Sequence, residues 1–152
     1  MPTLKVGAKA PEFSVQNAEG QRVSLKDLRG KKVVLYFYPK DDTPGCTREA
    51  CSFRDNITHL AKRNAVVIGV SVDSTESHKK FAGKYGLPFT LLSDEKKELV
   101  RSYGVWQKKS LYGREYMGTV RTTFVIDEKG IITNIFHKVK VDGHTAEVLE
   151  AL

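Results

Sequence analysis

The chain has 152 residues, 40% of them hydrophobic, with two cysteines and a formal net charge of +7. This length suits a single domain over residues 1–152 whose core folds without disulfide crosslinks, leaving the cysteines free for chemistry. No stretch approaches the roughly 18 apolar residues of a membrane span and residues 1–8 lack a signal-peptide core, so we expect a cytoplasmic protein with reduced thiols and no membrane partner. The basic residues form only short pairs such as Lys31-Lys32, without a nucleic-acid motif, so we expect a solvated basic surface and no nucleic-acid partner.

The first part of the chain predicts a hairpin followed by a buried strand. Residues 12–16 and 21–25 flank the turn sequence Asn-Ala-Glu-Gly at 17–20, a pattern typical of a β-hairpin. Residues 33–38 are continuously apolar and rich in β-branched and aromatic side chains, as in a central strand that is covered on both faces. Pro39 ends this strand.

The middle of the chain alternates helices and strands. A helix is expected from Pro44 to about residue 63, followed by a second buried strand over residues 65–72. Asp73, with Glu76 three residues later, resembles a capping box that starts a helix ending near residue 85.

The last third of the chain predicts further strands and two helices. Residues 89–92 favour a short strand, and a helix opened by Ser93-Asp94-Glu95 is expected to run to residue 103. Residues 120–126 and 131–138 predict an antiparallel hairpin, and a helix is expected from about residue 143. The order indicates an α/β protein with a mixed central sheet and helices on both faces. This is the element order of the thioredoxin fold, with an N-terminal β-hairpin extension.

The two cysteines lie where a buried strand gives way to a helix. Pro44 suits the first helical position, which makes Thr43 the N-cap and places Cys46 in the first turn. The unpaired amides of that turn favour negative charge, so we expect Cys46 to be stabilised as its thiolate. Cys51 is close enough in sequence to resolve an oxidised Cys46. The spacing differs from Cys-x-x-Cys.

Helical geometry places the two cysteines on different sides of this helix. At about 100° per residue, Cys46 belongs to an apolar stripe that faces the core, and Cys51 lies about 140° around, at the rim. The predicted stripe consists of Cys46, Ala50, Phe53, Ile57, Leu60 and Ala61. Residues five apart in a helix have Cα atoms about 8.6 Å apart, whereas a disulfide needs less than about 7 Å. A Cys46–Cys51 disulfide therefore requires part of the helix to unwind.

Metal binding is disfavoured by the sequence. Two thiols without a companion pair of Cys or His cannot supply the four ligands of a structural zinc site. The histidines are dispersed without ligand spacing and are expected at surface or rim positions: His59, His78, His137 and His144. We therefore expect no metal site.

The segment from Pro39 to Thr47, together with Cys51, resembles the active-site motif of peroxiredoxins. The likeness is to the bacterioferritin comigratory protein or peroxiredoxin Q subfamily, of the atypical two-cysteine type. It covers essentially the whole chain and also involves residues 10–13, 36–39, 91–94, 103–106 and 121–127. The pattern Pro-x-x-x-Thr-x-x-Cys is highly specific, and a second cysteine five residues later marks the subfamily.

The resemblance implies a thiol-dependent peroxidase that reduces hydrogen peroxide and alkyl hydroperoxides. Cys46 would attack the peroxide and become a sulfenic acid, and Cys51 would resolve it to an intramolecular disulfide. Thioredoxin or a similar dithiol protein would reduce that disulfide. No metal, flavin or haem is implied, and a monomer or weak homodimer is expected.

The resemblance also implies roles for residues around Cys46. Thr43 would hydrogen-bond the thiolate and the peroxide, Arg121 would supply a permanent positive charge, and Pro39 would shield the pocket from water. Glu49, one turn after Cys46, is a candidate for orienting Arg121, with an exposed helix carboxylate as the alternative.

Two other classes of function stay open at this point. A thioredoxin-like disulfide reductase would use the same fold but would normally carry Cys-x-x-Cys. A redox sensor or nucleic-acid-binding module would use the disulfide or the positive charge as a signal. The aromatic segment 106–116 either borders the pocket or makes a subunit contact, or Trp106 simply packs in the core.

Overall fold

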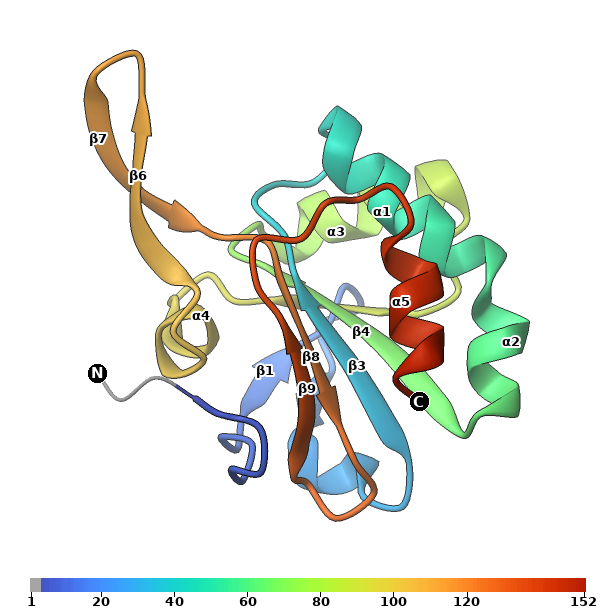
Figure 1. Ribbon diagram of the computed structural model, residues 1–152. Helices are drawn as coiled ribbons and strands as arrows, with labels where there is room; N and C mark the ends of the chain where they lie inside the picture. The colour runs from blue at the N-terminus through green and yellow to red at the C-terminus, as the bar shows by residue number, and fades with distance from the viewer. Residues whose placement is uncertain (1–3) are drawn as a thin grey trace.

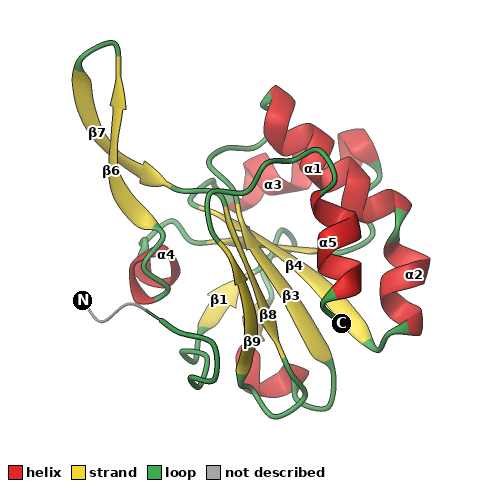
Figure 2. Ribbon diagram, viewed as in Figure 1, coloured by secondary structure: helices red, strands yellow, loops and turns green. Residues whose placement is uncertain are grey.

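The computed structural model describes residues 4–152; residues 1–3, which begin the segment considered above for targeting, lie outside the described part. A five-stranded sheet forms the centre of the molecule, with helices packed against it (Figures 1 and 2). Its strands, in the order in which they pair, are β5 (Thr90–Ser93), β4 (Ala65–Ser71), β3 (Lys32–Phe37), β8 (Thr122–Ile126) and β9 (Ile132–Phe136).

The central strand β3 determines the layering. It pairs in parallel with β4 and antiparallel with β8, so that Leu35 lies opposite Ile68 on one side and Phe124 on the other. Alternate residues of this apolar strand enter separate core clusters on the two faces of the sheet. The predicted mixed sheet of the thioredoxin fold is therefore confirmed.

Helices cover both faces. The face that receives Val34, Tyr36 and Tyr38 is covered by α1 (Pro44–Asp55), α2 (Ile57–Lys62), α3 (Thr75–Tyr85) and α5 (His144–Glu150). The other face is covered by α4 (Glu98–Ser102), a 3₁₀ turn η1 (Leu25–Leu28) and the segment around the N-terminal hairpin. That hairpin pairs β1 (Ser14–Gln16) with β2 (Arg22–Ser24), which confirms the predicted extension. No helix within residues 4–152 has the length and apolarity to cross a membrane.

The helix predicted over 44–63 is interrupted at Asn56, which separates α1 from α2. The Asn56 side-chain amide donates to the carbonyl of Ser52 at 2.8 Å, while the Asn56 backbone N–H bonds the carbonyl of Phe53 instead. An asparagine side chain competes with the helical backbone in this way. Beyond the break, Leu60 is buried as predicted, but Ala61 is exposed and does not belong to the apolar stripe.

The start of α3 also differs from the prediction. Its N-cap is Ser74, whose hydroxyl accepts the N–H of Ser77 at 3.1 Å, and not Asp73. The Asp73 carboxylate is already used, because it accepts the N–H of Asp41 and the hydroxyl of Ser71. A capping box read from sequence cannot anticipate such a partner from a distant loop.

The helix α4 begins at Glu98, later than the predicted Ser93-Asp94-Glu95 start. The Asp94 carboxylate accepts the backbone N–H groups of Leu99 and Val100 at 3.1 and 2.8 Å. Asp94 therefore satisfies the first turn of α4 from five and six residues upstream, across an intervening turn.

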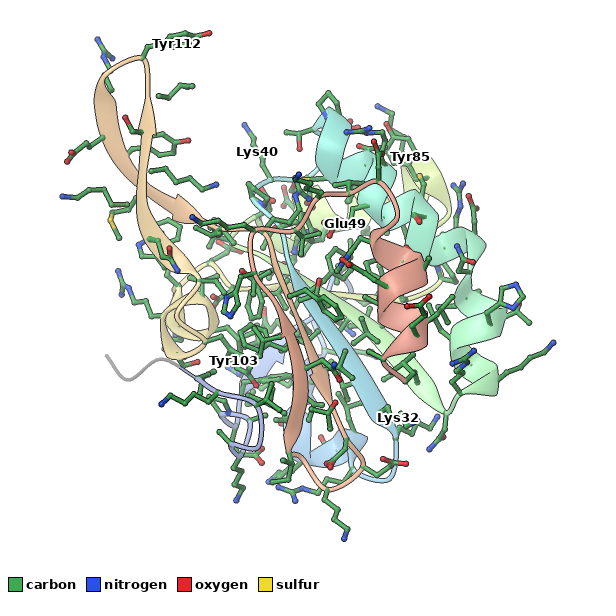
Figure 3. All side chains as sticks on the ribbon, in the orientation of Figure 1. Lys32, Lys40, Glu49, Tyr85, Tyr103 and Tyr112 are labelled. Atoms are coloured by element: carbon green, nitrogen blue, oxygen red, sulfur yellow. The ribbon has the colours of Figure 1, made fainter. Side chains whose placement is uncertain are left out.

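The aromatic segment 106–116 belongs to a hairpin of β6 (Trp106–Leu111) and β7 (Arg114–Thr119). Figure 1 shows this hairpin projecting from the body, and Tyr112 at its tip is 98% exposed (Figure 3). Tyr112 and Gly113 both have positive φ, as a tight two-residue hairpin turn requires. At the base, Trp106 packs against the core, with the Lys97 ammonium 5.5 Å from its ring centroid.

Two of the four histidines contradict the expectation of surface positions. His59 and His137 are exposed, but His78 and His144 are buried. His144 Nε2 lies 2.7 Å from the Thr123 hydroxyl and its Nδ1 lies 2.6 Å from a Glu147 carboxylate oxygen. Burial lowers the pKa of His144, although Glu147 opposes the change. The scattered sequence positions gave no sign of these buried partners.

Candidate active site

The first turn of α1 holds Cys46 at the end of the sheet where β3 terminates. Thr43 is the N-cap, Pro44 is the first helical residue, and the Thr43 carbonyl accepts the N–H of Thr47 at 2.8 Å. Cys46 is 1% exposed and packs in the core cluster, while Cys51 is half-buried, so both placements agree with the prediction. Both thiols are free within an unbroken α1.

Arg121 joins Cys46 to a buried carboxylate. It directly precedes β8, whose first residue Thr122 pairs with Phe37 at the end of β3, and this register brings Arg121 to the start of α1. Arg121 Nη2 donates to Cys46 Sγ at 3.3 Å, and Nη1 donates to Glu49 Oε1 at 2.6 Å. The sequence offered two readings of Glu49, and the one in which it orients Arg121 matches this contact. Glu49 is a buried residue of α1 and is labelled in Figure 3.

Burial and the neighbouring charges shift the pKa values in this cluster in opposite directions. Burial raises the pKa of Glu49 to about 7, although Arg121 lowers it. Burial lowers the pKa of Arg121, but the charges of Glu49 and Cys46 outweigh it and leave that pKa above its usual value. Among the described residues, Glu49 Oε2 and the Tyr36 hydroxyl are buried without a hydrogen-bond partner. Of these two atoms, Glu49 Oε2 belongs to the carboxylate that binds Arg121, whereas the Tyr36 hydroxyl lies over Gly69 of β4.

Two further features of this site, which involve Gly45 and Lys109, were not predicted from sequence. A Cβ atom on Gly45 would lie 3.2 Å from Arg121 Nη2, so a glycine before Cys46 leaves room for the guanidinium. Lys109 of β6 contributes a second positive charge near the site. Burial and the charge of Arg121 lower the pKa of Lys109, and Cys46 raises it. Neither contact could be found from local sequence, because each joins distant segments.

Thr43 and Pro39 occupy the loop that connects β3 to α1, and both are half-buried. The Thr43 hydroxyl donates to the carbonyl of Lys40 at 2.9 Å and, within residues 4–152, makes neither a capping bond nor a hydrogen bond to Cys46. The hydroxyl hydrogen of Thr43 is thus used in a hydrogen bond within the loop, and the lone pairs of its oxygen remain available as acceptors.

A second polar cluster lies beside the same loop. Asp41, Asp73 and His78 offer potential metal-ligand atoms that all lie within 4.8 Å of one another. Hydrogen bonds already engage both oxygens of Asp41, both ring nitrogens of His78 and Oδ2 of Asp73. A cation bound there would have to replace these bonds.

Comparison with known proteins agrees with this geometry. The AhpC/TSA family profile matches residues 6–135. Peroxiredoxin Bcp of Bacillus subtilis is 49% identical over 150 residues, which cover 99% of this chain and 96% of the relative. Peroxiredoxin Bcp of Escherichia coli K12 is 44% identical over 152 residues, which cover 100% of this chain and 97% of the relative.

The solved structures that resemble this chain include proteins of the PrxQ and bacterioferritin comigratory kind. A cysteine-to-serine mutant of PrxQ from Xylella fastidiosa has a TM-score of 0.93 at 33% identity and covers 99% of this chain and 96% of its own. The bacterioferritin comigratory protein of Xanthomonas campestris, studied for its alkyl peroxide reduction activity, has a TM-score of 0.88 at 37% identity and covers 91% and 88% of the two chains.

A thioredoxin fold with a buried, arginine-bound cysteine at a helix start defines a thiol oxidoreductase of the peroxidase class. The chain belongs to the AhpC/TSA family, and its full-length relatives are peroxiredoxins of the Bcp and PrxQ kind.

Proposed function

We propose that this peroxiredoxin reduces hydrogen peroxide and alkyl hydroperoxides with Cys46 as the nucleophile. The observation that carries the proposal is the hydrogen bond from Arg121 Nη2 to Cys46 Sγ at 3.3 Å in the first turn of a helix. A guanidinium and unpaired helix amides both favour the thiolate, which is the reactive form.

In the first step the thiolate attacks the terminal oxygen of the hydroperoxide. The S–O bond forms as the O–O bond breaks, and the departing oxygen takes a proton and leaves as water or an alcohol. Cys46 is oxidised to a sulfenic acid. Arg121, held by the buried Glu49, supports the negative charge that develops on the oxygens, and the acceptor lone pairs of Thr43 receive the peroxide O–H. Pro39 limits water at the loop side of the pocket.

In the second step Cys51 resolves the sulfenic acid. Its sulfur attacks Cys46 Sγ, water leaves, and an intramolecular disulfide remains. Because the cysteines are five residues apart in α1, where Cα atoms lie about 8.6 Å from each other, the helix must unwind locally first. A dithiol protein such as thioredoxin then reduces the disulfide by exchange.

Coupled turnover tests the proposal. Purified protein, thioredoxin, thioredoxin reductase and NADPH are mixed with hydrogen peroxide or cumene hydroperoxide, and the loss of NADPH absorbance is followed as the readout. We expect peroxide-dependent turnover. Reduction of insulin without peroxide consumption would instead indicate a disulfide reductase, and peroxide consumption with dithiothreitol but never with thioredoxin would remove thioredoxin as the reductant.

A further inference from the structure

Asp41, two residues before Thr43, ties the active-site loop to α3. Its Oδ1 accepts the hydroxyl of Tyr38 at 2.6 Å, and its Oδ2 accepts the hydroxyl of Ser77 at 2.8 Å. The same Oδ2 lies 2.6 Å from His78 Nδ1. Asp41 is 7% exposed and His78 is 0% exposed, so this contact is shielded from water. A loop beside a reactive thiol is therefore anchored by a buried pair of ionisable side chains.

The carbonyl of Leu92 fixes how the protons are distributed in this pair. His78 Nε2 lies 2.8 Å from the Leu92 carbonyl oxygen, which can only accept, so Nε2 carries a hydrogen. The contact between His78 Nδ1 and Asp41 Oδ2 then needs a second proton between them. The bond is consequently a strong one, and removing either partner leaves the other buried without its match.

The peptide bond between Lys40 and Asp41 links these buried side chains to Thr43 through hydrogen bonds at its N–H and at its carbonyl. Its N–H, which belongs to Asp41, donates to Asp73 Oδ2 at 2.9 Å, and its carbonyl, which belongs to Lys40, accepts the Thr43 hydroxyl at 2.9 Å. Asp73 is itself held by the Ser71 hydroxyl at 2.6 Å. Because the peptide unit is planar, fixing the N–H also fixes the direction of the carbonyl.

We propose that His78, Asp41 and Asp73 are positioning residues for the peroxide step. They hold the Lys40–Asp41 peptide so that its carbonyl takes the single hydroxyl hydrogen of Thr43, and Thr43 then presents only acceptor lone pairs to the hydroperoxide O–H. This inference rests on the proposed role of Cys46. A free hydroxyl would instead rotate between donor and acceptor orientations and lose part of this preorganisation.

The test separates peroxide activation from simple thiol reactivity. Cys51→Ser is the parent protein, so that only Cys46 reacts. Two second-order rate constants are measured at one pH, for oxidation by hydrogen peroxide and for alkylation by iodoacetamide, which needs no hydrogen bond from the site to an O–O bond. His78→Leu should slow the peroxide reaction about tenfold, as the loss of one oriented hydrogen bond predicts, and leave alkylation within about twofold.

Two further variants make the test specific. His78→Asn keeps a donor at the position of Nδ1 and should recover most of the peroxide rate. In a Thr43→Val background, which lacks the hydroxyl, His78→Leu should cause no further loss, because effects that pass through one group are not additive. Tyr103→Phe, which loses a part-buried hydrogen bond to the Pro11 carbonyl on the opposite face of the sheet, is the matched control and should change neither rate.

Equal losses in both rates, or an undiminished effect in the Thr43→Val background, would overturn the inference. If His78→Leu does not fold, Asp73→Ala removes the acceptor of the Asp41 N–H at a half-buried position and should give the same selective loss. A Cys51→Ser parent that fails to react with peroxide would contradict the proposed function itself, which is a different result from a normal parent with unaffected variants.

Discussion

Two buried polar clusters adjoin the loop between β3 and α1, and they differ in how fully their atoms are hydrogen-bonded. Around Asp41 and His78, both carboxylate oxygens and both ring nitrogens have partners. Around Cys46 and Arg121, Glu49 Oε2 has none among the described residues. A fully hydrogen-bonded cluster holds its side chains in fixed positions, whereas a buried carboxylate oxygen without a partner marks a site that is not arranged for stability alone. The first cluster suits support and the second suits chemistry.

The largest expected effect comes from replacing Cys46, the residue at the centre of the reactive cluster. Cys46→Ser should abolish peroxide turnover, because within the described part of the chain no other thiol is paired with Arg121, and the fold should be retained since serine is nearly the same size. Stopped-flow peroxide consumption and circular dichroism check both points. Cys51→Ser should complete one oxidation and then fail to cycle with thioredoxin. Wild-type turnover in Cys46→Ser would move the chemistry away from this cluster.

Arg121→Lys should produce the next largest effect. The ammonium keeps the charge but cannot bond Cys46 and Glu49 with a planar fork of donors. Loss of one preorganised donor to the transition state costs about 2.7–4 kcal/mol, so the second-order rate constant with peroxide should fall on the order of 10²-fold. Gly45→Ala, which crowds the same guanidinium, should act in the same direction with a smaller loss. An unchanged rate in Arg121→Lys would exclude this role.

The difference between the two clusters predicts that oxidation changes the structure around Cys46 and leaves the structure around Asp41 and His78 unchanged. In a protein shown to contain the Cys46–Cys51 disulfide, amides of residues 43–54 should lose protection from hydrogen exchange, on the order of tenfold or more, because α1 has unwound. The Asp41 amide, bonded to Asp73, and α3 should keep theirs. Equal protection of residues 46–54 in both redox forms would contradict unwinding.

The smallest expected effect concerns stability and pH. The folded state raises the pKa of Glu49 from 4.5 to about 7, so it binds this proton more tightly than the unfolded chain does. The resulting stability is fully present below about 4.5 and is lost as pH rises through about 7. Glu49→Gln stays neutral, so it should match the wild type at about pH 4.5 and exceed its unfolding free energy by about 1–3 kcal/mol at about pH 8. Urea denaturation at both pH values measures this, and an equal difference at the two would contradict it.

Local sequence signals predicted the parts of the molecule that depend on neighbouring residues. The helix start at Pro44, the inward position of Cys46 and the covered strand β3 all follow from short patterns. The position of Arg121 came from family resemblance alone, since it lies 72 residues from Glu49. The pairing of Asp41 with His78, 37 residues apart, was missed and the histidine was expected at the surface. Tertiary contacts of this kind leave no periodic trace in a single sequence.

The break at Asn56 has a consequence for the energetics of the proposed redox cycle. Because α1 and α2 have separate hydrogen-bond ladders, α1 is a short cooperative unit that can melt while α2 stays folded. Joining the two helices with Asn56→Ala would favour the reduced, helical form over the disulfide form. The reduction potential of the Cys46–Cys51 couple would then become more oxidising, as equilibration with a glutathione redox buffer would measure. In the proposed cycle, one asparagine side chain thus helps to set the free-energy gap between the reduced form and the disulfide form.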